Sequence, residues 1–506
     1  MAKTVVEILN TGKLTAPALL TPGRPTLPYD GLRKHVAATI DALNARGIGR
    51  NDRVGIVLAN GPEMASAFLA VAAGATAAPL NPAYKEEEFD FYLSDLKAKA
   101  LIVKKGDNTP AIAVAKRLGA RVIEAEWDES GPAGLFKLTG GMDGKPTANG
   151  GPAKADHIAM VLHTSGTTSR PKIVPLSQAN IAASAGHISN WLALTPADRC
   201  FNIMPLFHIH GLIAGVLSTM AAGASVFCCP GFNALSSFRW MEEAMPTWTT
   251  AVPTMLQAIL GRANSNKEII KKLPLRFIRT SSAALPPPIM AELEQTFGVP
   301  VLESYGMTEA AHQMASNPLP PRARKSGSVG LAAGPKVAIM DTAGNLLPAG
   351  QIGEIVIQGP DVFGGYENNP KATAEAFTNG WFRTGDQGVM DKEGYVALTG
   401  RLKEIINRGG EKISPREVDD VIIEHPAVDQ VVCFAMPHPK LGEDVAAVVV
   451  LKQGASADER TIRDFAASRL AAFKVPAKVL FMEEIPKGAT GKLQRIGLAE
   501  KLGLTG

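Results

Sequence analysis

The hydrophobic and polar positions of this chain follow two alternating patterns for most of its length. Short apolar runs, such as those from Arg53 to Leu58 and from Ala100 to Lys104, predict buried strands. The stretch from Gly61 to Ala73, directly after the first of these strands, predicts a helix. Strands that alternate with helices are typical of parallel βαβ units, so the pattern predicts an α/β fold.

The pattern changes from about Gly353, where short strands between glycine turns predict a small antiparallel or barrel-like subdomain. A basic segment begins at Arg401 and leads into a last region, in which Val431 to Met436 and Val445 to Leu451 predict strands and Asp458 to Leu470 predicts a helix. We therefore predict two domains. Residues 1–400 form a large domain of parallel α/β subdomains plus the barrel-like subdomain, and residues 401–506 form a small α+β domain.

Composition narrows the classes of function. The chain has 506 residues, and its 52 basic and 48 acidic residues nearly balance, so no nucleic-acid or membrane-surface role is predicted. The first ten residues lack the basic and apolar parts of a secretory signal, and the Ala-rich run over residues 65–79 is too short to span a bilayer. The four cysteines lack the spacing of metal or disulfide sites, which favours a reducing cytoplasm. The oligomeric state is left open.

Candidate chemistry begins with the segment from Thr164 to Lys172 (TSGTTSRPK), which follows a predicted strand. Its hydroxyl and backbone N–H groups are donors for phosphate oxygens, and Lys172 adds a positive charge. The order of its residues differs from that of a Walker loop. Taken alone, the segment fits a polar surface turn as well as it fits a phosphate site.

Four more clusters follow in order along the chain. They are Tyr305-Gly306-Met307-Thr308-Glu309, Thr384-Gly385-Asp386, Gly400-Arg401-Leu402-Lys403-Glu404, and Pro486-Lys487 with Gly491-Lys492. Together with the first segment, their order and separation resemble the ANL superfamily of acyl-CoA synthetases, nonribosomal adenylation domains and luciferases. The resemblance covers essentially the whole chain. It implies an ATP-dependent, AMP-forming reaction in which a carboxylic acid becomes an acyl-adenylate and then a thioester.

The resemblance implies a role for each matching residue. Glu309, with Thr168, would bind Mg²⁺, whose charge offsets the charge on the departing pyrophosphate. Asp386 would accept hydrogen bonds from both ribose hydroxyls, assisted by Arg401. Lys492 would be the catalytic lysine of the first half-reaction, where it reaches the carboxylate and the α-phosphate. The positions matched to ATP or AMP binding are Thr164, Ser165, Gly166, Thr167, Thr168, Lys172, Ser282, Ala283, Ala284, Glu303, Ser304, Tyr305, Gly306, Met307, Thr308, Asp386, Arg401 and Lys492.

The same resemblance implies that Lys403 is the hinge about which a mobile C-terminal domain turns between the two half-reactions. Gly409 and Gly410 would let coenzyme A (CoA) approach the backbone, and a simple β-turn is the competing explanation of this glycine pair. Lys492 has a competing explanation too, as a solvated lysine near the chain end. Ile173 stands where the superfamily often has a glycine, which predicts a stiffer phosphate loop.

The segments matched to acid binding carry hydrogen-bond donors. They are Met204 to Gly211, Thr280 to Ala284 and Ala310 to Met314. An unpaired buried donor costs about 1–3 kcal/mol, so a site of this kind selects a polar acid. A small dicarboxylate fits, with His208, Ser282 and His312 around the carboxylate that is not activated. A nearby anion would favour the charged form of these histidines.

The longer strings around these segments, among them HTSGTTSRPK, PLFHIHGL and MTEAAHQMASNPLP, resemble oxalate–CoA ligases of plants and fungi. This resemblance implies oxalate as the acid, and the absence of a following carrier domain favours free CoA as the acceptor. Other short polar acids, aryl or fatty acids, and an adenylation enzyme that loads a carrier protein stay open. His208, assigned to catalysis with Glu309 and Lys492, has a CoA-tunnel gate as its alternative role. His312 has that of a core histidine.

Overall fold

The computed structural model describes residues 2–142, 145–164, 171–486 and 495–504. It divides into two compact units, each described here by itself. Unit 1 comprises Met1–Val337 and Ile357–Phe382, and unit 2 comprises Ala338–Val356 and Arg383–Gly506. The predicted mixed α/β class is confirmed. The domain boundary near residue 401 stays a prediction.

The first sheet of unit 1 has seven strands in the order β7-β6-β5-β3-β4-β8-β9. Its five inner strands are parallel, as the alternating pattern predicts, and β7 and β9 are antiparallel edges. Residues Lys137–Thr139 form the edge strand β7. The elements are β3 (Arg53–Val57), α3 (Pro62–Gly74), β4 (Thr76–Pro79), α4 (Glu86–Leu96), β5 (Ala100–Lys104), α5 (Pro110–Arg117), β6 (Arg121–Glu126), β7 (Lys137–Thr139), β8 (Ile158–Thr164) and β9 (Lys172–Ser177).

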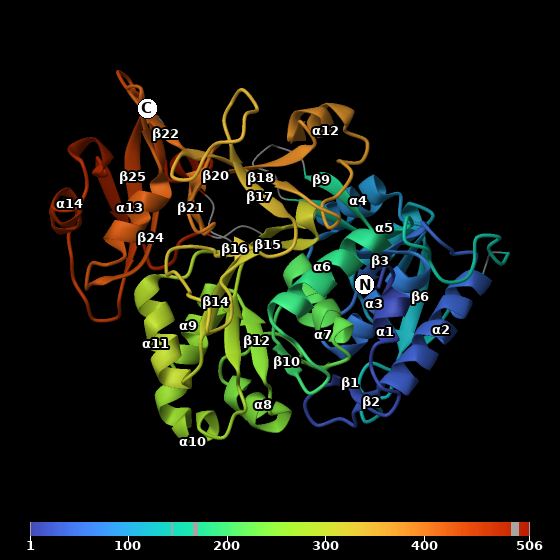
Figure 1. Cartoon of the computed structure of the whole chain (residues 1–506). Coiled ribbons are helices and arrows are strands. Elements are labelled where there is room, and N and C mark those ends of the chain that lie inside the picture. The colour runs from blue at the N-terminus through green and yellow to red at the C-terminus, as the bar shows by residue number, and fades with distance from the viewer. Residues whose placement is uncertain (1, 143–144, 165–170, 487–494, 505–506) are drawn as a thin grey trace. The chain divides into compact units, whose positions relative to one another are not determined.

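The second sheet of unit 1 has nine strands in the order β16-β15-β14-β13-β12-β10-β11-β1-β2 (Figure 1). The six strands from β14 to β1 are parallel, and β12 and β13 are buried along their length, as strands covered on both faces are. The strands are β1 (Pro17–Leu20), β2 (Leu27–Pro28), β10 (Arg199–Asn202), β11 (Ser225–Cys228), β12 (Trp248–Ala251), β13 (Phe277–Thr280), β14 (Val301–Met307), β15 (His312–Ser316) and β16 (Leu331–Ala332).

Helices connect these strands and complete unit 1. One of them, η1, is an eight-residue π-helix, a rare form that occurs often at functional sites. The remaining helices and one short strand are α1 (Val5–Leu9), α2 (Tyr29–Ala45), α6 (Gln178–Trp191), η1 (His210–Leu217), α7 (Ser218–Ala221), α8 (Ser237–Ala244), α9 (Pro253–Leu260), η2 (Ala263–Asn266), α10 (Lys267–Ile270), α11 (Pro287–Phe297), η3 (Thr308–Ala310), α12 (Pro370–Ala376) and β19 (Phe377–Thr378).

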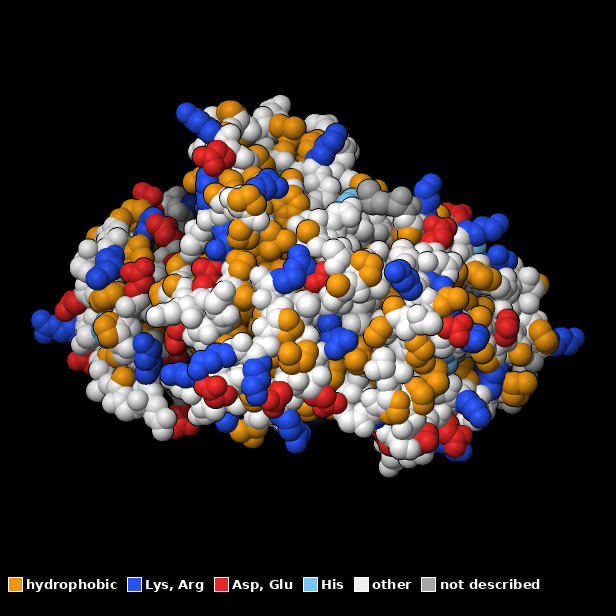
Figure 2. All heavy atoms as spheres, turned by 60° about the horizontal axis from the view of Figure 1, so that its bottom comes forward, with side chains coloured by type: hydrophobic (Ala, Val, Ile, Leu, Met, Phe, Trp, Pro, Cys, Tyr) orange, Lys and Arg blue, Asp and Glu red, His pale blue; other side chains and the backbone are white. Residues whose placement is uncertain are grey.

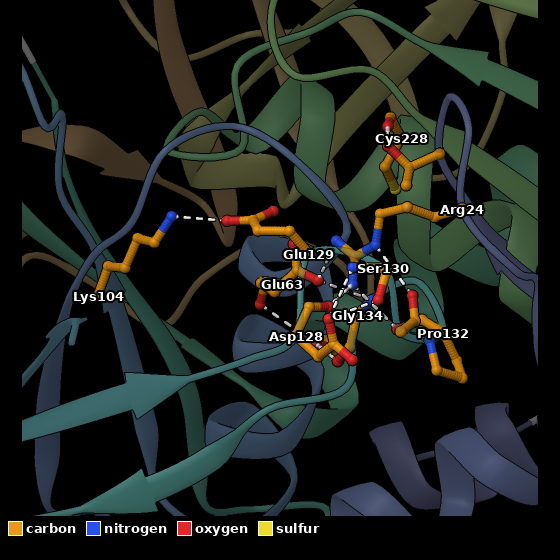
Figure 3. A network of polar contacts seen from close by, with 12 residues as sticks. Arg24, Glu63, Lys104, Asp128, Glu129, Ser130, Pro132, Gly134 and Cys228 are labelled. Atoms are coloured by element: carbon orange, nitrogen blue, oxygen red, sulfur yellow. Dashed lines mark hydrogen bonds and ion pairs between the residues drawn. The ribbon is translucent and has the colours of Figure 1, made fainter.

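A buried ion pair holds the region around the N-terminus of α3 in unit 1 (Figure 3). Arg24 Nη1 lies 2.7 Å from Glu63 Oε1, and both side chains are about nine-tenths buried. The other guanidinium nitrogens of Arg24 donate to the carbonyl oxygens of Asp128, Gly131 and Pro132. Glu63 also accepts a hydrogen bond from the backbone N–H of Gly134 (3.0 Å). The pair therefore ties the segment after β6 to the start of α3.

Unit 2 contains most of a five-stranded, largely antiparallel sheet and a separate C-terminal sheet of order β23-β22-β25-β24, with β26 beside β25. The strands predicted from Val431 and from Val445 are longer than expected, because β24 and β25 pair as one long antiparallel hairpin. The elements are β17 (Lys336–Met340), β18 (Ile352–Gln358), β20 (Trp381–Met390), β21 (Val396–Arg401), β22 (Ile406–Arg408), β23 (Glu411–Ile413), α13 (Pro415–Ile422), β24 (Val428–His438), β25 (Gly442–Leu451), α14 (Glu459–Ala467), η4 (Ala472–Lys474), β26 (Lys478–Phe481) and α15 (Leu498–Lys501).

The surface view shows basic and acidic side chains interspersed with apolar ones on the face that it presents (Figure 2). Across the described ranges, no helix has both the length and the apolar character needed to cross a membrane. The four cysteines are buried and free of disulfide bonds, and burial raises the pKa of each thiol. These thiols are therefore packing groups and not reactive ones.

Candidate active site

The two ends of the predicted phosphate segment lie on paired strands. β8 ends at Thr164 and β9 begins at Lys172, and these two residues are register partners. Ser165, Gly166, Thr167 and Thr168, which the sequence assigns to phosphate and Mg²⁺, lie outside the described residues. Ile173 is 3% exposed and pairs with His163. It is therefore a core residue of β9, which accounts for a bulky residue at a position where glycine is usual.

Lys172 and Glu309 both contact one aromatic side chain, that of Tyr366. The Lys172 ammonium lies 4.5 Å from the centroid of the Tyr366 ring, a cation–π contact. The Tyr366 hydroxyl donates a hydrogen bond to Glu309 Oε1 (2.9 Å), and burial, reinforced by the charge of Glu309, raises the pKa of the tyrosine. The structure thus brings together two residues assigned from the sequence. It adds Tyr366, which sequence reasoning missed.

Glu309 is a suitable magnesium ligand in a site of this kind. Its side chain is buried, and its backbone carbonyl accepts a hydrogen bond from the N–H of Phe363 (2.8 Å). Within the described parts of the chain, no group of three or more His, Cys, Asp or Glu side chains could hold a metal. Mg²⁺ needs no such cage, because it is commonly held by one or two carboxylates together with substrate phosphates and water.

Two of the segments matched to ATP or AMP binding run side by side. One follows β13, and the other, Glu303 to Tyr305, lies on the neighbouring parallel strand β14, where Glu303 pairs with Thr280 of β13. The hydroxyl of Ser281 donates to the carbonyl of Ser304 (3.0 Å), and the hydroxyl of Ser304 donates to the carbonyl of Thr280 (2.9 Å). Ligands of open α/β sheets bind at the carboxyl ends of parallel strands, and these bonds fix that edge. Ser282, Ala283 and Ala284 follow directly after β13.

Gly306 is required by the hairpin that follows. β14 pairs with the antiparallel β15 through Met307 and His312, with a bulge between Tyr305 and Gly306. A Cβ atom added to Gly306 would lie 1.8 Å from the carbonyl oxygen of His312. No other residue fits this position without moving a strand. The bulge therefore sets the positions of Tyr305, Met307 and Thr308.

A cluster of buried polar side chains lies next to this hairpin. We call it the histidine cluster, and it consists of His210, Thr250, Arg279, Ser282, His312 and Gln313. The His210 and His312 rings are stacked, with centroids 4.9 Å apart. His210 Nδ1 lies 3.1 Å from the Ser282 hydroxyl, and His210 Nε2 lies 2.6 Å from the Thr250 hydroxyl.

Arg279 lies at the centre of the histidine cluster. Its Nη2 donates to His312 Nε2 (3.1 Å) and Gln313 Oε1 (3.2 Å), and its Nη1 donates to the Thr250 hydroxyl (3.1 Å). The side chain is fully buried, and burial lowers the pKa of the guanidinium to about 9. Sequence reasoning missed Arg279. The signal available was a charged residue directly before the segment from Thr280 to Ala284 that the sequence matches to acid binding.

Backbone strain concentrates in the same place. Ser282 has a φ of 74° and His312 a φ of 106°, in the region that favours glycine. Such conformations cost about 1–3 kcal/mol each and are most common at functional sites. Of the residues predicted to bind the acid, Ser282 and His312 therefore share one cluster. His208 is half-buried just before η1, and its ring packs against Phe207 with centroids 4.5 Å apart.

Unit 2 holds the candidate ribose and hinge residues. Asp386 and Arg401 are register partners on β20 and β21, and Arg401 Nε lies 3.2 Å from Asp386 Oδ1. Lys403 is exposed in the turn between β21 and β22. Gly409 and Gly410, both with positive φ, form the two-residue turn between β22 and β23. Lys492 lies outside the described residues.

Arg495 holds the end of the segment that follows Lys492. Its Nη2 lies 2.5 Å from Asp419 Oδ2, and its Nε lies 3.3 Å from Glu404 Oε2, one residue after the predicted hinge. Burial lowers the pKa of Arg495, but the Asp419 carboxylate reverses this, and the net shift is upward. These ion pairs connect the hinge region to the core of unit 2.

Comparison with known proteins now identifies the family. Residues 10–367 match the family model described as AMP-binding enzyme, and residues 417–492 match the AMP-binding enzyme C-terminal domain. The chain belongs to the AMP-binding enzyme family. This AMP-binding enzyme is 45% identical over 453 residues to the oxalate–CoA ligase of Arabidopsis thaliana. The match covers 89% of this chain and 88% of the relative.

A second curated relative of this AMP-binding enzyme is the oxalate–CoA ligase of Saccharomyces cerevisiae, 43% identical over 476 residues that cover 89% of this chain and 87% of the relative. Among solved structures, ATP-bound MatB from Rhodopseudomonas palustris has a TM-score of 0.89 and 31% identity, and the match covers 99% of each chain. The family predicted from the five ordered motifs is confirmed.

Proposed function

We propose that this AMP-binding enzyme converts oxalate to oxalyl-CoA, with ATP cleaved to AMP and pyrophosphate. The reaction class, AMP-forming acid–CoA ligation with ATP, Mg²⁺ and CoA, is the one predicted from the sequence and is confirmed by the family and its relatives. Oxalate is the acid of the two curated relatives. For this chain, it is the proposal.

The observation that carries the proposal is the histidine cluster. It places two imidazoles, a serine hydroxyl and a buried guanidinium beside strands that lead to the candidate AMP-binding segments. These groups hydrogen-bond to one another, but an aryl or fatty acid bound there would offer no acceptor to the Ser282 hydroxyl and no negative charge to the buried Arg279 guanidinium. A second carboxylate gives them acceptors. The cluster therefore supports a small dicarboxylate over an apolar acid.

The proposed reaction has two steps. In the first, a carboxylate oxygen of oxalate bonds to the α-phosphorus of ATP, and the bond to pyrophosphate breaks. In the second, the CoA sulfur bonds to the acyl carbon, AMP leaves with the carboxylate oxygen, and the thiol proton is released. Glu309 and, in the prediction, Thr168 would hold Mg²⁺, which would supply positive charge against the phosphates. Lys172 carries a further positive charge near Glu309.

The other assigned residues serve the two steps in turn. Asp386, with its carboxylate on β20, would hold the ribose hydroxyls, and Lys492 would bring a positive charge for the first step alone. A turn at Lys403 would exchange the lysine for the segment of Gly409 and Gly410, which would accept CoA. The two glycines form a hairpin turn and have no side chains, so a ligand can approach their backbone closely.

We also infer a cytoplasmic enzyme that acts on small molecules and not on nucleic acid or membranes. The four free, buried cysteines fit a reducing compartment. The near balance of 52 basic and 48 acidic residues fits a protein without a polyanionic partner.

Pyrophosphate release with a panel of acids tests the proposal. Oxalate, malonate, glycolate, acetate, octanoate and coumarate are each supplied with ATP, Mg²⁺ and CoA, and the thioester is identified by mass. We expect the highest kcat/KM with oxalate. A higher value with octanoate or coumarate would contradict the proposed acid, and adenylation without any CoA thioester would point to a carrier-protein acceptor.

A further inference from the structure

Arg279 is a buried cation whose partners carry no negative charge. Its side chain is fully buried, and no carboxylate of the described residues forms an ion pair with it. The guanidinium Nε has no hydrogen-bond partner there. A buried charge is costly unless an opposite charge or a full set of acceptors compensates it. The contacts of Arg279 among the described residues therefore leave its positive charge without a compensating anion.

A second buried arginine shows the difference. Arg46, in unit 1, donates to the backbone carbonyl oxygens of Ala42, Leu138 and Gly140, which satisfy all three sides of its guanidinium. Carbonyl oxygens carry the negative ends of peptide dipoles and so stabilise the cation. Arg279 instead uses imidazole nitrogens, a hydroxyl and one amide oxygen.

The hydrogen bonds of Arg279 also decide where the protons of the two histidines lie. A guanidinium donates and never accepts, so His312 Nε2, 3.1 Å from Nη2, must accept and cannot carry a proton. His210 Nε2 lies 3.4 Å from Arg279 Nη1 and so must accept as well, and the Thr250 hydroxyl, which accepts from Arg279, can give its one proton to His210 Nε2. Both imidazoles are then neutral, with their protons on Nδ1. For His312, this inference differs from the charged form that the sequence analysis expects next to a bound anion.

The remaining protons of the cluster point away from the guanidinium. His210 Nδ1–H donates to the Ser282 hydroxyl (3.1 Å), which is then able to give its own proton to a ligand. Chains of this kind polarise each bond in turn, since every donor becomes stronger when its other end accepts. Through Thr250 and His210, the charge of Arg279 thus polarises the hydroxyl of the half-buried Ser282.

We infer that Arg279 is the positioning residue for the carboxylate of the acid that is not adenylated. It supplies the positive charge, and it holds His210 and His312 as neutral Nδ1–H donors, so that the acid contacts Ser282 and the imidazoles and not the guanidinium itself. The inference rests on the proposed function, because it concerns the acid-binding site of that reaction. It makes the enzyme selective for acids that remain anionic after one carboxylate is activated.

Steady-state kinetics of Arg279→Met gives the first test, with Arg46→Met as the matched control. Loss of the charge should raise KM for oxalate by about 10- to 100-fold, the range for a hydrogen bond to a charged group. KM for ATP should stay within about twofold, because Arg279 is not among the residues assigned to the nucleotide and Ser282, which is, keeps its side chain in this variant. Arg46→Met should lower thermal stability and leave KM for oxalate unchanged. An unchanged oxalate KM in folded Arg279→Met would overturn the inference.

Arg279→Lys covers the case in which the methionine variant fails to fold. A lysine keeps the charge but is a compact point charge, and it cannot donate to His312, Thr250 and Gln313 with the fork geometry of arginine. We expect an oxalate KM above that of the wild type and, where Arg279→Met folds, below that of the methionine variant. A wild-type oxalate KM in Arg279→Lys would show that only the charge matters and would refute the positioning role.

Nuclear magnetic resonance of ¹⁵N-histidine-labelled protein tests the protonation directly and needs no substrate. His210→Asn and His312→Asn spectra assign the two signals. We expect both rings of the wild type to be neutral Nδ1–H tautomers at about pH 7. Imidazolium signals, or Nε2–H tautomers, would contradict the inference even if oxalate is the substrate. If oxalate fails in the acid panel while the tautomers are as expected, the proposed acid is wrong and the arginine–histidine arrangement stands.

Discussion

Gly306→Ala should disable the candidate active site without unfolding the protein. The added Cβ would lie 1.8 Å from the His312 carbonyl oxygen, whereas real Cβ contacts are essentially never below 3.0 Å. The hairpin of β14 and β15 must therefore open by about 1.2 Å, the difference between these two distances. That displacement moves Met307 and Thr308 relative to His312, and so the AMP-binding and acid-binding residues relative to each other.

The size of the effect follows from this displacement. A misplacement of about 1 Å in an active site can lower the rate about 100-fold, which corresponds to about 2.7 kcal/mol of transition-state stabilisation. The assay is oxalate-dependent exchange of labelled pyrophosphate into ATP, which reports the first half-reaction alone. Circular dichroism and thermal unfolding should show a folded protein.

Gly261→Ala is the matched control for this substitution. Gly261 has a φ of −58° and an added Cβ would meet nothing closer than 3.6 Å, so alanine fits there. We expect wild-type exchange in Gly261→Ala. Exchange within about threefold of the wild type in Gly306→Ala would show that the hairpin does not position the reacting groups, and the reasoning would fail.

Three other predictions concern stability and Lys492. Arg24→Met leaves Glu63 buried with its ion pair broken, so we expect the free energy of unfolding, measured by denaturant titration, to fall by about 3–5 kcal/mol. The double variant with Glu63→Leu should recover most of this loss, and no recovery would contradict the coupling of the two residues. Burial raises the pKa of Asp361 above its ordinary 3.8, so its stabilising contribution is complete below that pH and is lost as the pH rises through the raised pKa. Asp361→Asn should therefore gain thermal stability relative to the wild type as the pH rises, and a constant difference in melting temperature between pH 4 and 7 would count against it. Lys492→Ala should abolish pyrophosphate exchange and spare thioester formation from preformed acyl-adenylate, and equal loss of both steps would remove its assignment.

Much of the fold follows from local pattern. The apolar run at Arg53 and the helical stretch after Gly61 correspond to β3 and α3 within one or two residues, because buried strands and helices carry their periodicity in sequence. The long hairpin of β24 and β25 was only partly predicted. The two strands extend beyond their apolar residues, because they are held there by pairing with each other. The sequence of one strand alone does not show this pairing.

The candidate site was predictable where a motif fixes a local geometry. Glu309 and Gly306 belong to one short cluster, and their roles follow from neighbours in sequence. Arg279 and Gln313 meet only because β13 and β15 lie in the same sheet, and sequence spacing does not report that contact. His210 lies in the histidine cluster although the sequence assigns His208 to the acid, and the role of His208 stays a prediction. Which side chains of this segment face the cluster depends on where the π-helix begins.

The central claim is that this chain couples oxalate to CoA through an adenylate, and product stoichiometry tests it most directly. Purified protein is incubated with oxalate, ATP, Mg²⁺ and CoA, and the nucleotide, pyrophosphate and thioester products are measured together. The account predicts equal amounts of AMP, pyrophosphate and oxalyl-CoA, all dependent on oxalate. ADP with free phosphate, or AMP formed without oxalyl-CoA, would contradict it.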